Sequence, residues 1–135
     1  MNAAIEILAD PTLDGRADFD FLFGAWRVDH RRLKRRGAGA GDDWDCFSGT
    51  HICRPALDGL CNVEEHDMSA RGLQGLALRT FDIVRRTWAI YWVSSADGLL
   101  GEPVFGRFEG GEGRFYGVDL DASRPVKVMA TPFPL

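Results

Sequence analysis

Short runs of β-branched and aromatic residues recur along this chain of 135 residues, and Gly or Asp separates one run from the next. A spacing of about a dozen residues between such runs is typical of hairpin-linked strands. Asp58-Gly59, Asp97-Gly98 and Glu109–Gly113 supply the backbone freedom that tight turns need. No long helical periodicity interrupts the pattern, which therefore predicts an all-β, antiparallel up-and-down barrel. We expect eight strands, at about residues 25–35, 43–54, 59–68, 74–82, 86–94, 103–109, 113–119 and 125–130.

The segment Phe19–Trp26 is a hydrophobic lead-in that ends in Gly-x-Trp, a pattern that commonly opens the first strand of a small barrel. Gly24 permits a sharp turn, and we expect Trp26 to plug the closed end with a partner for its indole N–H. The other end then stays open to a ligand. We expect a loose leader or one helical turn over residues 1–18, the barrel over 19–130, and a Pro-containing tail over 131–135.

Composition limits the partners of this single domain, of which 45% of the residues are hydrophobic and 27% are charged. The formal net charge of -4 gives no general attraction to nucleic acid or to an anionic membrane. The one basic cluster, residues 30–36, alternates its charges between two faces of a strand, which argues against nucleic-acid binding. No apolar run approaches the roughly 18 residues of a membrane span, and the N-terminus lacks a basic signal region. We therefore expect a cytoplasmic protein with no nucleic-acid or membrane partner.

Three cysteines, Cys46, Cys53 and Cys61, favour free thiols because their number is odd and no export signal is present. Together with His51 and His66, these cysteines are candidate ligands for a zinc ion. The sequence has no Cys-x-x-Cys pair, however, and Cys46 and Cys53 point to opposite faces of one strand. We expect no metal and no cofactor. A Gly-x-Ser-x-Gly elbow and a phosphate-binding glycine loop are also missing from the sequence, which weakens the case for an enzyme.

Strand alternation identifies candidate binding residues. If Trp26 points inward, then Val28, His30 and Arg32 do so as well. In the third strand, Asn62, Glu64 and His66 share one face, whereas Glu65 lies on the other. Trp88 and Trp92 share a face of the fifth strand, where their rings could line a ligand site or simply fill the barrel. The candidate ligand-binding residues are Trp26, His30, Asn62, Trp88, Trp92 and Arg107, and no residue is singled out as catalytic.

Four segments carry a family resemblance: Phe19–Trp26, Arg54-Pro55-x-Leu57-x-Gly59-Leu60-x-Asn62-Val63-x-Glu65, Trp88-x-Ile90-Tyr91-Trp92 and Val104-x-Gly106-Arg107-Phe108-Glu109. In this order they resemble a bacterial calycin-like family of uncharacterised domains, distantly similar in fold to lipocalins, fatty-acid-binding proteins and nitrobindins. The resemblance covers residues 19–128 and implies a calycin-like barrel with no established activity. The chain departs from the family pattern after Val128, which puts barrel closure in doubt. It also departs from nitrobindins: Val28 and His30 replace glycines, and nothing corresponds to their haem-binding histidine, which disfavours haem.

These patterns favour noncovalent binding of a small hydrophobic or amphipathic molecule in the barrel. One alternative is an interaction module with a packed interior. Pro132 and Pro134 end the sheet after the last predicted strand, and an edge left unpaired invites a second copy of the chain, so we expect a homodimer. The other alternative is a small-molecule hydrolase or isomerase that uses His30 with a carboxylate of the third strand.

Overall fold

The computed structural model describes residues 15–35, 41–121 and 124–130, and over residues 118–121 and 124–130 it describes the strands but not their side chains. The predicted all-β class is confirmed. Most of the predicted leader and the whole of the predicted tail lie outside the described residues. The strands are β1 (Gly24–Leu33), β2 (Trp44–Ala56), β3 (Cys61–Met68), β4 (Leu73–Asp82), β5 (Thr87–Ser94), β6 (Val104–Glu109), β7 (Glu112–Asp121) and β8 (Arg124–Ala130).

The eight strands form one sheet in which each strand pairs antiparallel with its neighbours in the sequence, in the order β1 to β8. Hairpin connections between consecutive strands produce this order, as expected for an up-and-down topology. Within the described residues, β1 and β8 do not pair with each other, so they are the two edges of the sheet.

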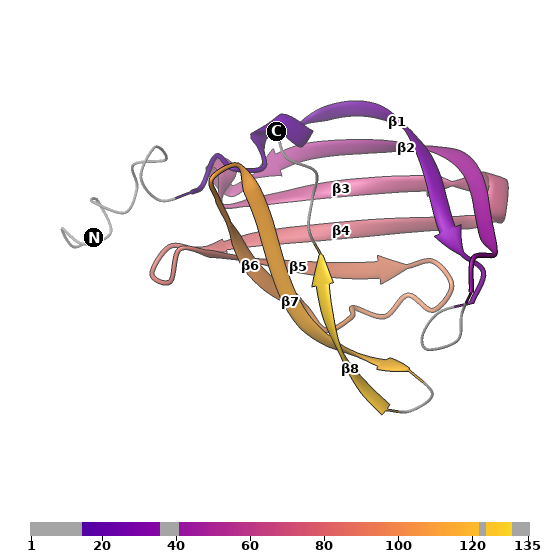
Figure 1. The fold of residues 1–135 in the computed structure, drawn as a ribbon. Coiled ribbons are helices and arrows are strands. Elements are labelled where there is room, and N and C mark those ends of the chain that lie inside the picture. The colour runs from indigo at the N-terminus through magenta and orange to yellow at the C-terminus, as the bar shows by residue number, and fades with distance from the viewer. Residues whose placement is uncertain (1–14, 36–40, 122–123, 131–135) are drawn as a thin grey trace.

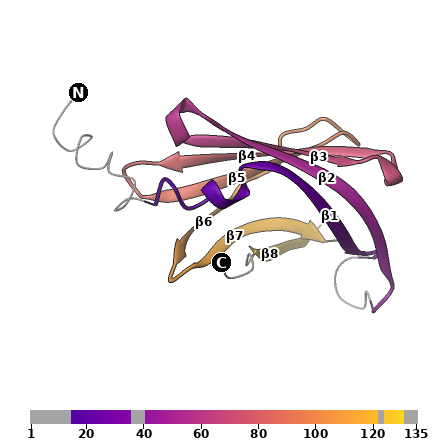
Figure 2. The same ribbon diagram turned by 90° about the horizontal axis from the view of Figure 1, so that it is seen from above.

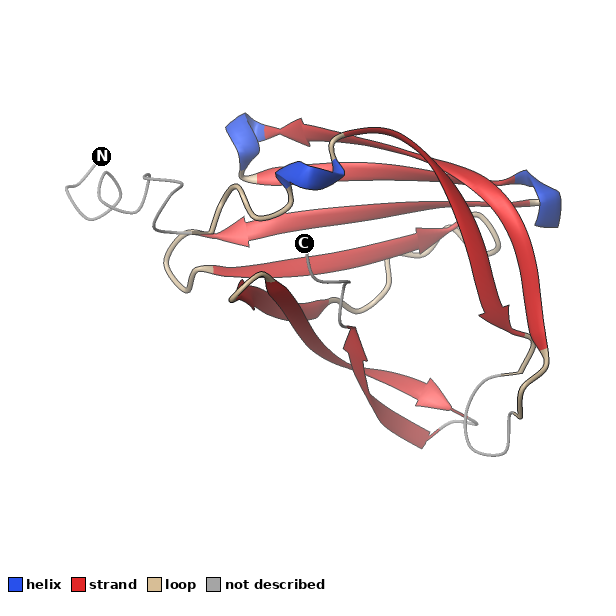
Figure 3. Ribbon diagram, turned by 45° about the horizontal axis from the view of Figure 1, so that its top comes forward, coloured by secondary structure: helices blue, strands red, loops and turns tan. Residues whose placement is uncertain are grey.

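The start of β3 differs from the prediction, because residues 59 and 60 do not belong to the strand. Gly59 is the last residue of a short 3-10 helix, η2 (Leu57–Gly59), and Leu60 follows it. All three residues of η2 have positive φ angles. A left-handed backbone cannot continue a strand, so pairing begins only at Cys61. Two more 3-10 helices, η1 (Asp20–Leu22) and η3 (Ser69–Arg71), are equally short, and Figure 3 shows them as small turns beside the sheet.

The sheet curls into a half-barrel (Figure 1). Strands β1 to β5 form its broad wall, and β6, β7 and β8 turn away from that wall, so that the sheet has a concave inner face. The view from above in Figure 2 shows β7 curving opposite the broad wall. Twist accumulates from strand to strand across an antiparallel sheet, which lets a sheet of eight strands curl in this way.

The hydrophobic core gathers on this inner face around Phe19, Phe81, Trp88 and Phe115. The ring of Phe19 packs edge-on against Trp88, with centroids 4.9 Å apart, and the indole N–H of Trp88 donates to the carbonyl of Gly15. The lead-in segment before β1 therefore contributes a core residue, Phe19, which packs directly against Trp88.

The prediction that Trp26 plugs the closed end is wrong, because 44% of Trp26 is exposed. Its indole N–H donates to the carbonyl of Leu22 at 2.7 Å, which holds the ring against η1. Trp26 lies on an edge strand with a neighbour on one side only, so fewer side chains are available to cover the ring. Gly24 has a φ of 118°, as the predicted sharp turn requires.

Candidate functional site

A cluster of polar side chains lies on the inner face next to the hydrophobic core. Arg79 and the core residue Phe81 are two positions apart on β4, so both point inward. The registers then place Asn62 opposite Arg79, Glu64 opposite Cys53, and His66 opposite His51. We call this set the inner polar cluster; its members are His51, Cys53, Asn62, Glu64, His66 and Arg79.

Arg79 is the buried centre of the inner polar cluster, with 8% of the residue exposed. One guanidinium nitrogen donates to Asn62 Oδ1 at 3.0 Å, and another donates to Glu64 Oε1 at 3.1 Å. The guanidinium also lies 4.9 Å from the centroid of the Phe19 ring, in a cation–π contact. Arg79 therefore joins the polar cluster to the core, and its charge is compensated by Glu64, as a buried charge requires.

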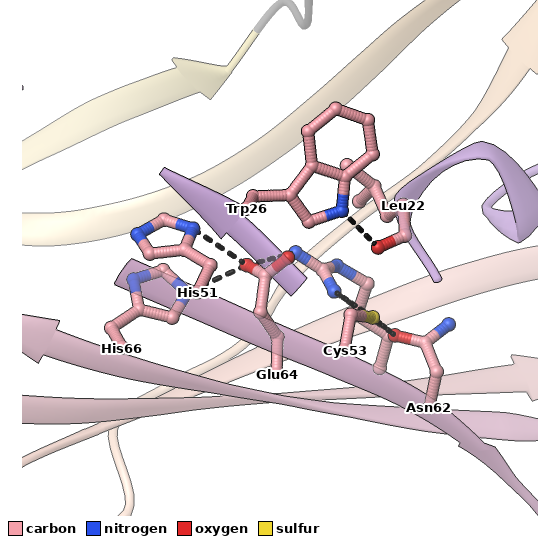
Figure 4. Close-up of polar contacts among 8 residues, drawn as sticks. Leu22, Trp26, His51, Cys53, Asn62, Glu64 and His66 are labelled. Atoms are coloured by element: carbon pink, nitrogen blue, oxygen red, sulfur yellow. Dashed lines mark hydrogen bonds and ion pairs between the residues drawn. The ribbon is translucent and has the colours of Figure 1, made fainter. Parts of the chain in front are cut away.

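Two histidines approach the same carboxylate oxygen of Glu64 (Figure 4). The Nε2 N–H of His66 donates to Glu64 Oε1 at 2.6 Å, and Nδ1 of His51 lies 3.7 Å from the same oxygen. The two imidazole rings stack with centroids 3.5 Å apart. Nε2 of His51 is buried and has no hydrogen-bond partner among the described residues. A buried polar atom that lacks a partner is uncommon in a folded protein.

The surroundings shift the pKa values of two cluster members. Burial by itself raises the pKa of Glu64, but the hydrogen bond from His66 and the charge of Arg79 outweigh it and lower the pKa to about 2. Burial lowers the pKa of His51 to about 4, and the nearby His66 adds to this effect while Glu64 opposes it. At neutral pH the cluster therefore holds a carboxylate at Glu64 and a neutral imidazole at His51.

Aromatic rings flank the inner polar cluster. Trp92 points inward from β5 and meets His66 edge-on, with centroids 4.9 Å apart, while 39% of Trp92 remains exposed. Its ring covers Gly75, where a Cβ atom would lie only 2.1 Å from the indole. Trp26 lies on the other flank, opposite His51 in the β1–β2 register. Two accessible indoles thus border a buried polar patch, a combination found in many small-molecule sites.

His30 lies further along β1 on the same inner face. Its ring stacks on Phe47, with centroids 4.7 Å apart, and lies 5.5 Å from His51. Burial is the largest cause that lowers the pKa of His30, and its Nε2 is buried without a hydrogen-bond partner in the described part of the chain. The sequence suggested that His30 could act with a carboxylate of the third strand, but the inward-facing carboxylate there, Glu64, is bonded to His66.

The six predicted ligand-binding residues therefore fall into three groups. Trp26, His30, Asn62 and Trp92 share the inner face with the polar cluster. Trp88 is 1% exposed and belongs to the core. The side chain of Arg107 is 58% exposed and pairs with Glu109 at 3.1 Å, on the outer face of β6.

The sequence predictions did not select His51, Glu64, His66 or Arg79 as site residues. Alternation along the third strand had already placed Asn62, Glu64 and His66 on one face and Glu65 on the other, and in the structure Glu65 is exposed. The missing information was the register between β2 and β3, which sets His51 beside His66. The sequence hypothesis grouped His51 and His66 with the cysteines, so it did not identify Glu64 as the partner of both histidines.

The three cysteines are free, as predicted. Cys53 and Cys61 are buried, whereas Cys46 is exposed. The thiol of Cys53 lies 4.0 Å from Asn62 Oδ1, and burial raises its pKa. Cys53 therefore acts as a small apolar group beside the inner polar cluster.

A groove of about 520 Å³ lies mainly on the outer face of β2 to β5, although His66 and Gly75 are also among its lining residues. Exposed or half-buried side chains such as Ile52, Glu65 and Leu76 line it. It lacks the buried charges and accessible indoles of the inner face, which makes the inner face the stronger candidate.

No protein-family model and no curated protein sequence matches the chain. The calycin-like resemblance therefore stays a prediction. None of the helices in the described ranges is long and apolar enough to cross a membrane.

Proposed function

We propose that the inner face binds a small, partly hydrophobic molecule noncovalently. Its apolar part would pack against Trp26 and Trp92, and its polar part would bind at the inner polar cluster. The observation that carries this proposal is the contact between an accessible indole, Trp92, and the buried His66–Glu64 pair. Aromatic walls with a few convergent polar groups are the usual composition of ligand sites.

Anilinonaphthalene sulfonate is a suitable probe because it combines apolar rings with one anionic group. We expect it to bind saturably to the native protein, and we expect Trp92→Ala to weaken binding by roughly tenfold, about 1.4 kcal/mol. The matched control is Trp44→Ala, since Trp44 lies under Arg31 on the outer face and contacts no member of the cluster.

Near-ultraviolet circular dichroism must show that both variants keep their tertiary packing, because this dye also binds loosely packed states. Equal binding by wild type, Trp92→Ala and Trp44→Ala would contradict the proposal. So would a complete lack of saturable binding.

The open edges of the sheet support a second candidate function, homodimerisation. On β1 the charged side chains of Arg27, Asp29 and Arg31 are exposed, and charges of this kind discourage strand pairing. β8 carries fewer charged residues, Arg124 and Lys127, and we therefore propose it as the pairing edge. Native mass spectrometry should give twice the 15.0 kDa chain mass, and a monomer throughout a concentration series would refute this candidate.

A further inference from the structure

Three side chains with metal-ligating atoms converge inside the half-barrel. His51 comes from β2, and Glu64 and His66 come from β3, two residues apart on one face. One ligand atom from each lies within 4.8 Å of the others. We propose that His51, Glu64 and His66 bind a divalent transition-metal ion of the zinc class.

The distances agree with this assignment after small side-chain rotations. Zinc bonds to histidine nitrogen and carboxylate oxygen are about 2.0–2.2 Å long, so ligand atoms around one ion lie roughly 3–4 Å apart. Nδ1 of His51 is already 3.7 Å from Glu64 Oε1. Nε2 of His66 is closer, at 2.6 Å, because an N–H proton joins the two atoms. An incoming metal would take the place of that proton on Nε2, and the ring would carry its one N–H proton on Nδ1, so that His66 binds as a neutral imidazole.

The donor set selects the class of metal. Two imidazole nitrogens and one carboxylate oxygen suit zinc, cobalt and other borderline ions, whereas magnesium and calcium prefer oxygen ligands. Three protein ligands also leave a coordination position free for water or for another molecule. The site would therefore resemble an open metal site more than a closed structural one.

Arg79 lowers the affinity of this site for a metal ion but does not block the site. Its guanidinium donates to Glu64 Oε1 at 3.1 Å and places a positive charge near the ion. A carboxylate has a second oxygen and several lone pairs, so Glu64 can keep the bond from Arg79 while it ligates a metal. Repulsion between Arg79 and the metal ion weakens binding, so we expect a micromolar dissociation constant instead of the lower value of a site without a nearby positive charge.

Burial separates this site from a chance pair of surface histidines. The side chains of His51, Glu64 and His66 are 15%, 5% and 14% exposed. The stacked rings hold both histidines against each other, and Nε2 of His51 has no partner among the described residues. The proposal does not depend on the small-molecule function, because it is tested with the metal alone.

The experiment titrates the EDTA-treated full chain with Co²⁺, which gives visible absorption bands in a tetrahedral site, followed by displacement with Zn²⁺. We expect one ion per chain and an increase in the melting temperature on binding. His51→Ala and His66→Ala should each weaken binding by about 100-fold. His30→Ala, which removes the only other histidine, and Cys46→Ser, which removes the exposed thiol, should keep it within about threefold.

Three results would overturn the proposal: no saturable binding up to about 1 mM metal, binding that survives both His51→Ala and His66→Ala, or binding that Cys46→Ser abolishes. A measurement on the wild type covers the case in which a variant fails to fold. Zn²⁺ should shift the imidazole nitrogen resonances of His51 and His66 in an NMR spectrum and leave those of His30 in place. Resonances of His51 and His66 that do not move would overturn the proposal as well.

Discussion

At the scale of single residues, Glu64 is the residue that connects most members of the inner polar cluster. It accepts hydrogen bonds from His66 and Arg79, and its side chain is only 5% exposed. Buried ion pairs contribute little net stability when compared with apolar replacements, yet the loss of one partner leaves the other charge uncompensated. Glu64 is thus the residue whose removal the fold should tolerate least.

We expect Glu64→Gln to lower the free energy of unfolding by about 3 kcal/mol in urea denaturation at pH 7. Glu65→Gln is the matched control. Glu65 is the next residue on the opposite face, half its side chain is exposed, and its pair with Arg54 is loose at 3.9 Å, so its loss should cost less than about 0.5 kcal/mol. Similar losses in the two variants would contradict the central position of Glu64.

The difference in unfolding free energy between wild type and Glu64→Gln should also depend on pH. The folded-state pKa of Glu64 lies below its usual 4.5, at about 2, so its contribution is present above pH 4.5 and is lost as the pH falls toward 2. The gap between wild type and Glu64→Gln should therefore narrow over this window. A gap that widens on acidification would mean that the carboxylate is not stabilised as described.

At the scale of the elements, alternation along each strand could be predicted, but the partners across strands could not. Parity alone put Asn62 and Glu65 on opposite faces, because side chains of a strand alternate whatever its neighbours are, but it did not tell which face points inward. The contact of His51 with His66 depends instead on the β2–β3 register, which the left-handed residues of η2 help to set. That turn conformation, with non-glycine residues at positive φ, has no clear sequence signal beyond Asp58-Gly59.

Gly75 gives a test of how β4 positions Trp92. A methyl group at this position would meet the indole at 2.1 Å, so Gly75→Ala must displace the ring. We expect a loss of about 1–3 kcal/mol in stability and weaker binding of anilinonaphthalene sulfonate. Gln74→Ala, the adjacent exposed residue on the other face, should change neither. If Gly75→Ala bound the dye like the wild type, the Trp92 ring would not form part of the site.

At the scale of the whole molecule, the inner face changes character along its length. Phe19 and Trp88 pack together in the core, Arg79 links that core to Glu64 and the histidines, and Trp26 and Trp92 border the polar patch with exposed rings. The sequence predicted the all-β class and the strand order because both follow from local patterns. It misplaced Trp26 because burial on an edge strand depends on what the rest of the sheet brings over it.

The most direct test of ligand binding at the inner face is an NMR titration of the four indole N–H groups with anilinonaphthalene sulfonate. If the account is correct, the signals of Trp26 and Trp92 shift together and saturate, while Trp44 on the outer face and Trp88 in the core stay in place. Shifts confined to Trp44, or no saturable shift of Trp26 and Trp92, would contradict it.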